Sequence, residues 1–172
     1  TSMGLTPLGG IAMGSRSGDL DPSVVTYIME QENITPAEMN RILNKESGLL
    51  GMSGVSADNR DILQEAENGN ERAALAIKEY CYIIAQYSGR YAAALNGVDV
   101  ITFAGGVGER GPDERAEICS YLSFMGVELD EEANKVKAEE KEISKPSSKV
   151  KVWIVPTEEE LMIARETMEL VK

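Results

Sequence analysis

The feature that most constrains the fold is a long helical pattern followed almost at once by a strand pattern. Apolar residues recur at three- and four-residue spacing between Glu71 and Leu95, namely at Ala74, Ile77, Cys81, Ile84 and Ala85. Asn96-Gly97 is a typical helix stop, and residues 98–103 form a short, apolar, β-branched run. We therefore expect the helix to be the spine of an α/β domain with more helix than strand.

Two further helices are predicted near the start of the chain, where an N-cap residue is followed by proline. Asp21 precedes Pro22, and Thr35 precedes Pro36. Proline at the first helical position after a capping residue is a typical helix start. Glu38 lies three residues after Thr35 and completes a capping-box pattern. Helices are expected after both prolines.

The last third of the chain predicts a strand and two more helices. Residues 130–149 are rich in lysine and glutamate, which is typical of a solvated helix leading into a surface loop. Residues 150–155 form a strand pattern, and a helix is expected from Pro156-Thr157 to about Val171. One face of that helix would carry Leu161, Ala164, Met168 and Val171. Since no internal repeat or long linker occurs, residues 1–172 are expected to form one domain.

The charge and hydropathy of the chain exclude two classes of partner. Twenty-nine acidic and seventeen basic residues give a net charge of -12, which repels nucleic acid and anionic membranes. The most apolar stretch, residues 73–95, is interrupted by Lys78, Glu79, Gln86 and Arg90. It is a core or interface helix rather than a membrane span, which needs about 18 uninterrupted apolar residues.

Localisation and redox state follow from the cysteines and the first residues. Cys81 and Cys119 are far apart, and the sequence holds no histidine that could complete a zinc site. Two reduced structural thiols are typical of a cytoplasmic protein. Residues 1–10 lack an initiator methionine and the features of a signal peptide, so we expect them to lie within a longer chain.

A glycine-rich stretch, Gly105-Gly106-Val107-Gly108-Glu109, lies between the predicted strand and the next helical pattern, which begins at Gly111-Pro112. We expect a glycine loop here. Glycines let the backbone approach a phosphate, ribose or base, and a following helix N-terminus supplies free N–H groups. A nucleotide is the ligand that this pattern favours, although the glycines could also serve turn geometry alone.

The same stretch permits a second interpretation. Gly106, Gly108 and Gly111 match the G-x-G-x-x-G pattern of a Rossmann-type NAD-binding domain, and Glu128 lies near the position of its ribose-binding acid. Against this, Pro112 follows the third glycine directly, and the residues just before Glu128 form a weak strand pattern. No Walker A sequence is present, so ATP would not be bound as in P-loop enzymes.

Arg16 lies among small residues in the segment 13–22. Small neighbours leave its guanidinium accessible, and the planar fork of donors suits phosphoryl oxygens. The alternative is that Arg16 pairs with Asp19 or Asp21 in a turn.

The segment 54–61 contains Asp58, which could hold a ribose, and Arg60, which could contact a base or phosphate. Equally, Ser56 or Asp58 could be an N-cap.

Pro156-Thr157-Glu158-Glu159-Glu160 places three carboxylates at a predicted helix start. Magnesium takes oxygen ligands, usually one or two carboxylates with waters and substrate phosphates, so one of these glutamates could hold it. The alternative is structural: Thr157 and Glu160 would form a capping box, and acidic residues favour the positive end of the helix dipole.

Taken in order, these segments resemble the acetate kinase family (acetate and propionate kinases). The matching segments are residues 1–8, the Arg16 segment, 54–61, 103–109 and 156–165. The resemblance implies a ribonuclease H-like domain of the actin-like and sugar-kinase-like ATPases, whose two domains close over ATP. Residues 1–172 would be the C-terminal, nucleotide-binding domain, with the N-terminal domain absent from this sequence.

The resemblance also implies residue roles. Arg16 matches the arginine that stabilises the transferring phosphoryl group, and Glu159 matches the magnesium-binding glutamate. The nucleotide-binding positions are Asp58, Asn59, Arg60, Gly106, Val107, Gly108, Glu109 and Arg110. In two places this sequence departs from the family: Arg110 and Glu158 both stand where asparagine is usual.

The implied reaction is reversible, magnesium-dependent transfer of a phosphoryl group from ATP to acetate, giving ADP and acetyl phosphate. The family's remaining catalytic groups, a histidine among them, lie in its N-terminal half, so this chain alone is predicted to be inactive. Family members pair as homodimers through this half. Acetate and propionate are not distinguished, because the acid pocket lies largely in the other half.

Overall fold

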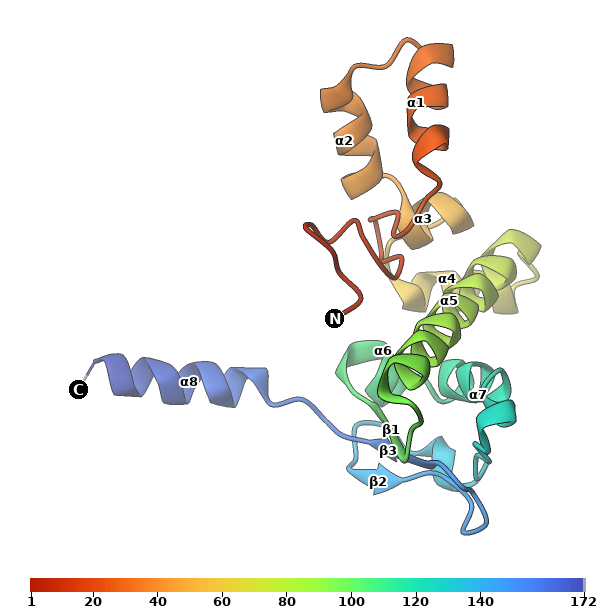
Figure 1. The fold of residues 1–172 in the computed structure, drawn as a ribbon, viewed down its shortest axis with the longest axis vertical. Coiled ribbons are helices and arrows are strands. Elements are labelled where there is room, and N and C mark those ends of the chain that lie inside the picture. Colours follow the sequence, from red (N-terminus) through yellow and green to blue (C-terminus); the bar gives the residue numbers. More distant parts are fainter. Residues whose placement is uncertain (172) are drawn as a thin grey trace. The chain divides into compact units, whose positions relative to one another are not determined.

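The computed structural model describes residues 1–171, which form two compact units divided after Asn96 (Figure 1). The first unit is helical and the second contains the sheet. The division coincides with the predicted helix stop, because Asn96 has the left-handed conformation (φ 57°) that ends a helix. That the two units act together as one nucleotide-binding domain stays a prediction.

The first unit contains five helices, as residues 1–96 are described throughout: α1 (Pro22–Gln31), α2 (Pro36–Lys45), α3 (Gly48–Ser53), α4 (Asn59–Glu67) and α5 (Glu71–Leu95). Both predicted starts are confirmed. The Asp21 carboxylate accepts from the N–H of Ser23, and Thr35 and Glu38 form the reciprocal capping box.

Helix α5 packs against α3 and α4. Its bounds are those predicted, and the side chain of Asn70 caps its first turn. Of the expected apolar face, Cys81 and Ala85 are buried whereas Ala74 is exposed, so the buried face begins at Ala73. The core below α5 contains Ile62, which is fully buried; such burial contributes about 1.5–3 kcal/mol.

The second unit contains a mixed sheet. Its elements are β1 (Val100–Phe103), α6 (Gly105–Arg110), α7 (Pro112–Ser120), the 3₁₀ turns Ser123–Met125 and Ala133–Lys135, β2 (Lys141–Glu142), β3 (Lys151–Ile154) and α8 (Glu159–Leu170). The strand order is β1-β3-β2, with β1 parallel and β2 antiparallel to β3. Val152 and Ile154 of β3 and the neighbouring Ile143 are fully buried and form one face of the sheet. Both predicted strands are confirmed.

Two predictions about this unit are wrong. The expected glycine loop is the short helix α6, because the Glu109 carboxylate accepts from the free N–H of Gly105 at its start (2.9 Å). The expected solvated helix in residues 130–149 is a 3₁₀ turn and strand β2. The Asp130 carboxylate accepts from two following N–H groups and forms a turn, and Ile143 is drawn into the core beside β3.

Helix α8 follows β3 after a short extended segment (Figure 1). None of its side chains is buried. The predicted apolar face therefore has no packing partner within the described residues of its unit. Among the residues that the structure describes, no helix combines the length and the apolar character needed to cross a bilayer.

Candidate functional site

The segment that carries Arg16 is fastened to the junction of α2 and α3 by backbone hydrogen bonds. The N–H of Ser17 donates to Leu43 (3.0 Å), and the N–H of Leu49 donates to Met13 (2.9 Å). The N–H of Met13 donates to the carbonyl of Arg16 itself (3.0 Å). The arginine is thus placed on a loop whose backbone is held from two sides.

The sequence left open that Arg16 forms an ion pair with Asp19 or Asp21 in a turn. The structure, which describes all three residues, shows no such pair. Its Nη1 lies 3.7 Å from the sulfur of Met13, a weak acceptor. Asp21 instead caps α1, and Asp19 bonds to residues of α5. Within the described part of the chain no ion pair involves Arg16, which leaves its guanidinium able to bind an anion.

Asp19 anchors the end of this loop, a role that the sequence did not reveal. Its carboxylate accepts from the N–H of Gly10 (2.8 Å), from the hydroxyl of Tyr87 and from Arg90 (3.3 Å). The Tyr87 bond, followed by the Gly10 bond, lowers the pKa of Asp19, and the bond to Asp19 raises the pKa of Tyr87. Arg90 also lies over the Tyr87 ring, 4.5 Å from its centroid.

Gly48 packs closely against the backbone of the same loop, and replacing this glycine tests the close approach. Its φ is +61°, and a Cβ there would lie 2.1 Å from the carbonyl oxygen of Met13 and 2.6 Å from that of Arg16. Gly48→Ala is therefore expected to destabilise the protein by at least about 2 kcal/mol in urea unfolding. The matched control is Gly89→Ala inside α5, where a Cβ meets open space and the change should be neutral or stabilising. Equal stability of the two variants would contradict this packing.

Asp58 is the N-cap of α4, which confirms the structural alternative for this residue. It accepts from the N–H of Arg60 (2.9 Å) and pairs with the guanidinium of the same residue (2.5 Å). These hydrogen bonds lower the pKa of Asp58 to about 2, so its carboxylate is ionised at neutral pH. Since Arg60 is largely exposed, both groups can still reach a ligand. Asn59 follows them as the first residue of α4.

Two motifs of the first unit, around Gly14 and around Asp58, lie side by side although they are far apart in the sequence. A Cβ at Gly14 would lie 2.6 Å from the carbonyl oxygen of Ala57, so the Arg16 loop runs against the residue just before Asp58. The structure thus brings the two segments into contact within one unit.

Helix α6 carries the glycine stretch. Gly106 is exposed and has open space where a Cβ would stand, which leaves the backbone accessible. Arg110 is exposed, whereas Val107 and Gly108 are half-buried and Gly108 packs against Phe103. The Glu109 carboxylate is buried. The hydrogen bond from the N–H of Thr157, together with those from the Thr157 hydroxyl and the N–H of Gly105, lowers the pKa of Glu109.

Arg115 of α7 fixes the position of α6 and was not recognised from the sequence. It is fully buried, and its Nη1 donates to the carbonyl of Gly108 (2.8 Å). That carbonyl would normally receive the N–H four residues later, which Pro112 lacks. The other donors bond to the Oδ1 and carbonyl of Asn134 and to the carbonyl of Val136. No local sequence pattern predicts these partners.

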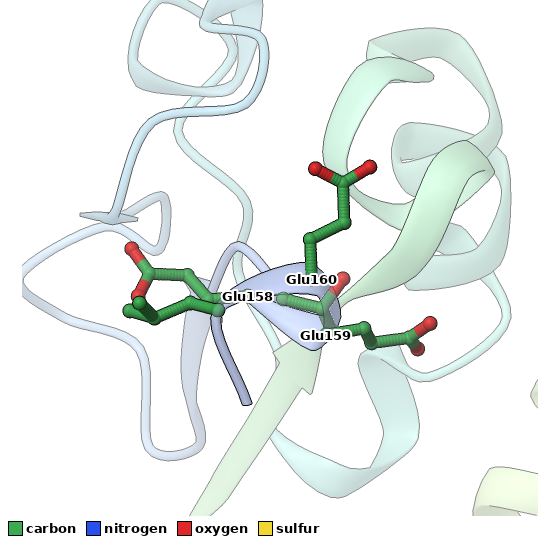
Figure 2. Close-up of a pocket in the computed structure, with 5 residues that line it drawn as sticks. Glu158, Glu159 and Glu160 are labelled. Atoms are coloured by element: carbon green, nitrogen blue, oxygen red, sulfur yellow. The ribbon is translucent and has the colours of Figure 1, made fainter. Parts of the chain in front are cut away.

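Glu159 is the first residue of α8 and lines an open pocket of about 430 Å³ with Thr157, Glu158, Glu160 and Leu161. The predicted capping box is wrong, because the hydroxyl of Thr157 donates to Glu109 (3.0 Å) instead. Figure 2 shows the three glutamate carboxylates pointing away from one another. In the described residues no three metal-ligating side chains converge. The geometry fits a magnesium ion that takes one carboxylate and completes its shell with water and phosphate.

Proteins of known sequence match this chain over nearly all of its length. The model of the Acetokinase family matches residues 1–165. The acetate kinase of Dictyoglomus turgidum is 58% identical over 171 residues, which make up 99% of this chain and 42% of that protein. The acetate kinase of Carboxydothermus hydrogenoformans is 56% identical over 171 residues, 99% of this chain and 43% of that protein.

Solved structures give the same result. The crystal structure of Porphyromonas gingivalis acetate kinase matches with a TM-score of 0.92 at 50% identity, over 99% of this chain and 43% of that one. A propionate kinase from Francisella tularensis subsp. tularensis SCHU S4 matches with a TM-score of 0.88 at 39% identity, over 96% of this chain and 42% of that one.

The fold is therefore of the ribonuclease H-like, actin-like class that the resemblance implied. The chain belongs to the acetokinase family and spans 42% or 43% of the length of these relatives. The dinucleotide-binding alternative is not favoured. It needs a parallel strand ending near Glu128, and the structure has only an isolated bridge between Val127 and Val150 there.

Proposed function

We propose that this chain is the nucleotide-binding portion of a kinase that transfers a phosphoryl group from ATP to acetate, forming ADP and acetyl phosphate. The observation that carries the proposal is the conformation of Arg16. Its guanidinium is held on a braced loop with a thioether as its contact, so its donors remain available for phosphoryl oxygens. The family relationship supports the reaction class.

The remaining proposed site residues lie on the two units. Asp58, Asn59 and Arg60 start α4, and Gly106, Val107, Gly108, Glu109 and Arg110 form most of α6. We infer that each segment is a nucleotide-binding segment of its own unit. The exposed Arg60 offers donors to a phosphate or base, and the open backbone at Gly106 admits an adenosine.

Magnesium would be held by Glu159, and it would supply charge neutralisation at the phosphates. The acceptor carboxylate is already ionised, so the chain needs no strong base. Its residues contribute positioning and charge stabilisation, which dominate phosphoryl transfer. We further propose a cytoplasmic, homodimeric enzyme that acts on acetate, with propionate as the alternative substrate.

Because the chain spans less than half of its relatives, we expect it to have negligible kinase activity alone. Nucleotide binding is the property that tests the proposal directly. Calorimetric titration of the chain with ADP and magnesium should show binding, whereas NAD should give no heat of binding. Glu159→Ala is expected to remove the part of the ADP affinity that depends on magnesium.

Glu128→Ala is the matched control, since Glu128 is the residue that only the dinucleotide-binding alternative requires. It should leave ADP binding unchanged. Preference for NAD, or loss of NAD binding in Glu128→Ala, would support the dinucleotide-binding alternative. Failure to bind either nucleotide would remove the basis of the proposal.

A further inference from the structure

The side chain of Glu109 connects helix α6, which is proposed to bind the nucleotide, with the segment before Glu159, which is proposed to bind magnesium. Its Oε1 accepts from the N–H of Gly105 (2.9 Å), from the N–H of Thr157 (2.8 Å) and from the hydroxyl of Thr157 (3.0 Å). Gly105 begins the proposed nucleotide-binding helix α6, and Thr157 lies two residues before the proposed magnesium ligand Glu159. We call these three residues the Glu109 junction.

The junction is built for rigidity rather than for ligand contact. Glu109 is 8% exposed, and one of its oxygens already has three donors. Hydrogen bonds to an ionised carboxylate are roughly twice as strong as those between neutral groups. The backbone of the same residue is also held, since its carbonyl accepts from the N–H of Ala138 (2.9 Å). A side chain so occupied cannot turn toward a nucleotide without breaking these bonds.

The junction is also the contact that holds the start of α8 in place. The side chains of α8 are all exposed, and Glu158, its N-cap residue, makes no capping bond through its side chain. The described tethers of this stretch are the two bonds from Thr157, the bond from the N–H of Val155 to the carbonyl of Phe103 (2.9 Å) and the pairing of the preceding strand β3. Of these, the Thr157 bonds lie nearest to Glu159. The distance between α6 and Glu159 therefore depends on Glu109.

We propose that Glu109 is a positioning residue that couples nucleotide binding to magnesium binding, by setting the position of Glu159 relative to α6. The inference rests on the proposed function and revises it in one respect, because the Glu109 side chain does not itself contact the nucleotide. Magnesium bound to Glu159 and to ADP phosphate would strengthen ADP binding only while the two segments keep this spacing.

The test is calorimetric titration of the chain with ADP, with and without magnesium, in matched variants. The quantity compared is the ratio of the two dissociation constants, which cancels any general loss of ADP affinity. Glu109→Ala is expected to lower this magnesium enhancement by about 10- to 100-fold, the range found when the support of a metal ligand is removed. Glu139→Ala removes an exposed glutamate next to Ala138 and should have no effect.

Variants of Thr157 disturb the junction less and are used if circular dichroism shows that Glu109→Ala does not fold. Thr157→Val removes the hydroxyl bond but keeps the backbone bond, so it should lower the enhancement by a smaller factor. Thr157→Ser keeps the hydroxyl and should restore it.

The outcomes separate the inference from the proposed function. An equal loss of ADP affinity with and without magnesium in Glu109→Ala would mean direct nucleotide contact and would overturn the inference. An unchanged enhancement in Glu109→Ala and Thr157→Val would overturn it as well, while leaving the proposed function intact. Absence of ADP binding in the unmodified chain would overturn the proposed function and the inference with it.

Discussion

Arg16→Ala is expected to lower kcat by about 10³- to 10⁵-fold, the effect of removing an arginine that stabilises a transferring phosphoryl group. The assay needs a complete kinase, so this chain would replace the matching 171 residues of the Dictyoglomus turgidum acetate kinase. The physical reason is that charge develops on the equatorial oxygens in the transition state, where a fixed guanidinium acts without reorganisation. Acetyl phosphate formation is the measured quantity.

The pattern of the kinetic constants distinguishes this role from simple binding. A transition-state contact lowers kcat and kcat/KM together, whereas a ground-state contact raises KM with little change in kcat. The kcat of Arg16→Lys should lie between those of Arg16→Ala and the unmodified chimaera, because the charge remains but the planar fork of donors is lost. Arg41→Ala is the control, since its ion pair with Glu46 is exposed and should matter little. A kcat within tenfold of the unmodified chimaera in Arg16→Ala would exclude the proposed role.

Arg115→Met is expected to destabilise the chain by about 3–5 kcal/mol, because several acceptors around this fully buried side chain lose their donor at once. Methionine keeps much of the volume, so the loss comes mainly from hydrogen bonds and only slightly from a cavity. The orphaned acceptors are the carbonyls of Gly108, Asn134 and Val136 and the Oδ1 of Asn134. For a chain of this size such a change lowers the melting temperature by about 6–20 °C.

The measurement is thermal unfolding followed by circular dichroism. Arg165→Met, on the exposed helix α8, removes an arginine without disturbing buried acceptors and should change the melting temperature little. Arg115→Lys should also be destabilised, since an ammonium cannot reach carbonyls that a guanidinium fork spans. A melting temperature for Arg115→Met within 2 °C of the unmodified chain would show that these bonds contribute little net stability.

Local signals in the sequence predicted helices α1, α2 and α5 of the first unit but not the short helix α3. Asp21, Thr35, Asn96 and their neighbours act over two to four residues, and the caps formed where the pattern placed them. The strands were also predicted, because β-branched runs next to glycine or proline have few other solutions. The same reasoning failed at Thr157, whose capping-box pattern was outcompeted by a carboxylate 48 residues away.

The candidate site was predicted as a set of segments but not as a geometry. Residue types and spacing singled out Arg16, Asp58, the glycine stretch and Glu159 as candidates, and the resemblance to the family assigned their roles. The comparisons show the family, and the roles stay predictions. The surroundings of these residues were missed. Asp19 accepts a hydrogen bond from Tyr87, 68 positions away, and Arg115 donates to Asn134, 19 positions away. No local sequence pattern predicts contacts over such separations.

By itself the sequence determined the α/β class, the starts of several helices, the acidic character and the family. These depend on side-chain periodicity and on caps, whose energies act between residues close in the chain. Only the tertiary structure decided that the glycine stretch is a helix and that Glu109 holds Thr157 beside α6. Those outcomes depend on which buried donors and acceptors meet, because every such group must find a partner once water is excluded.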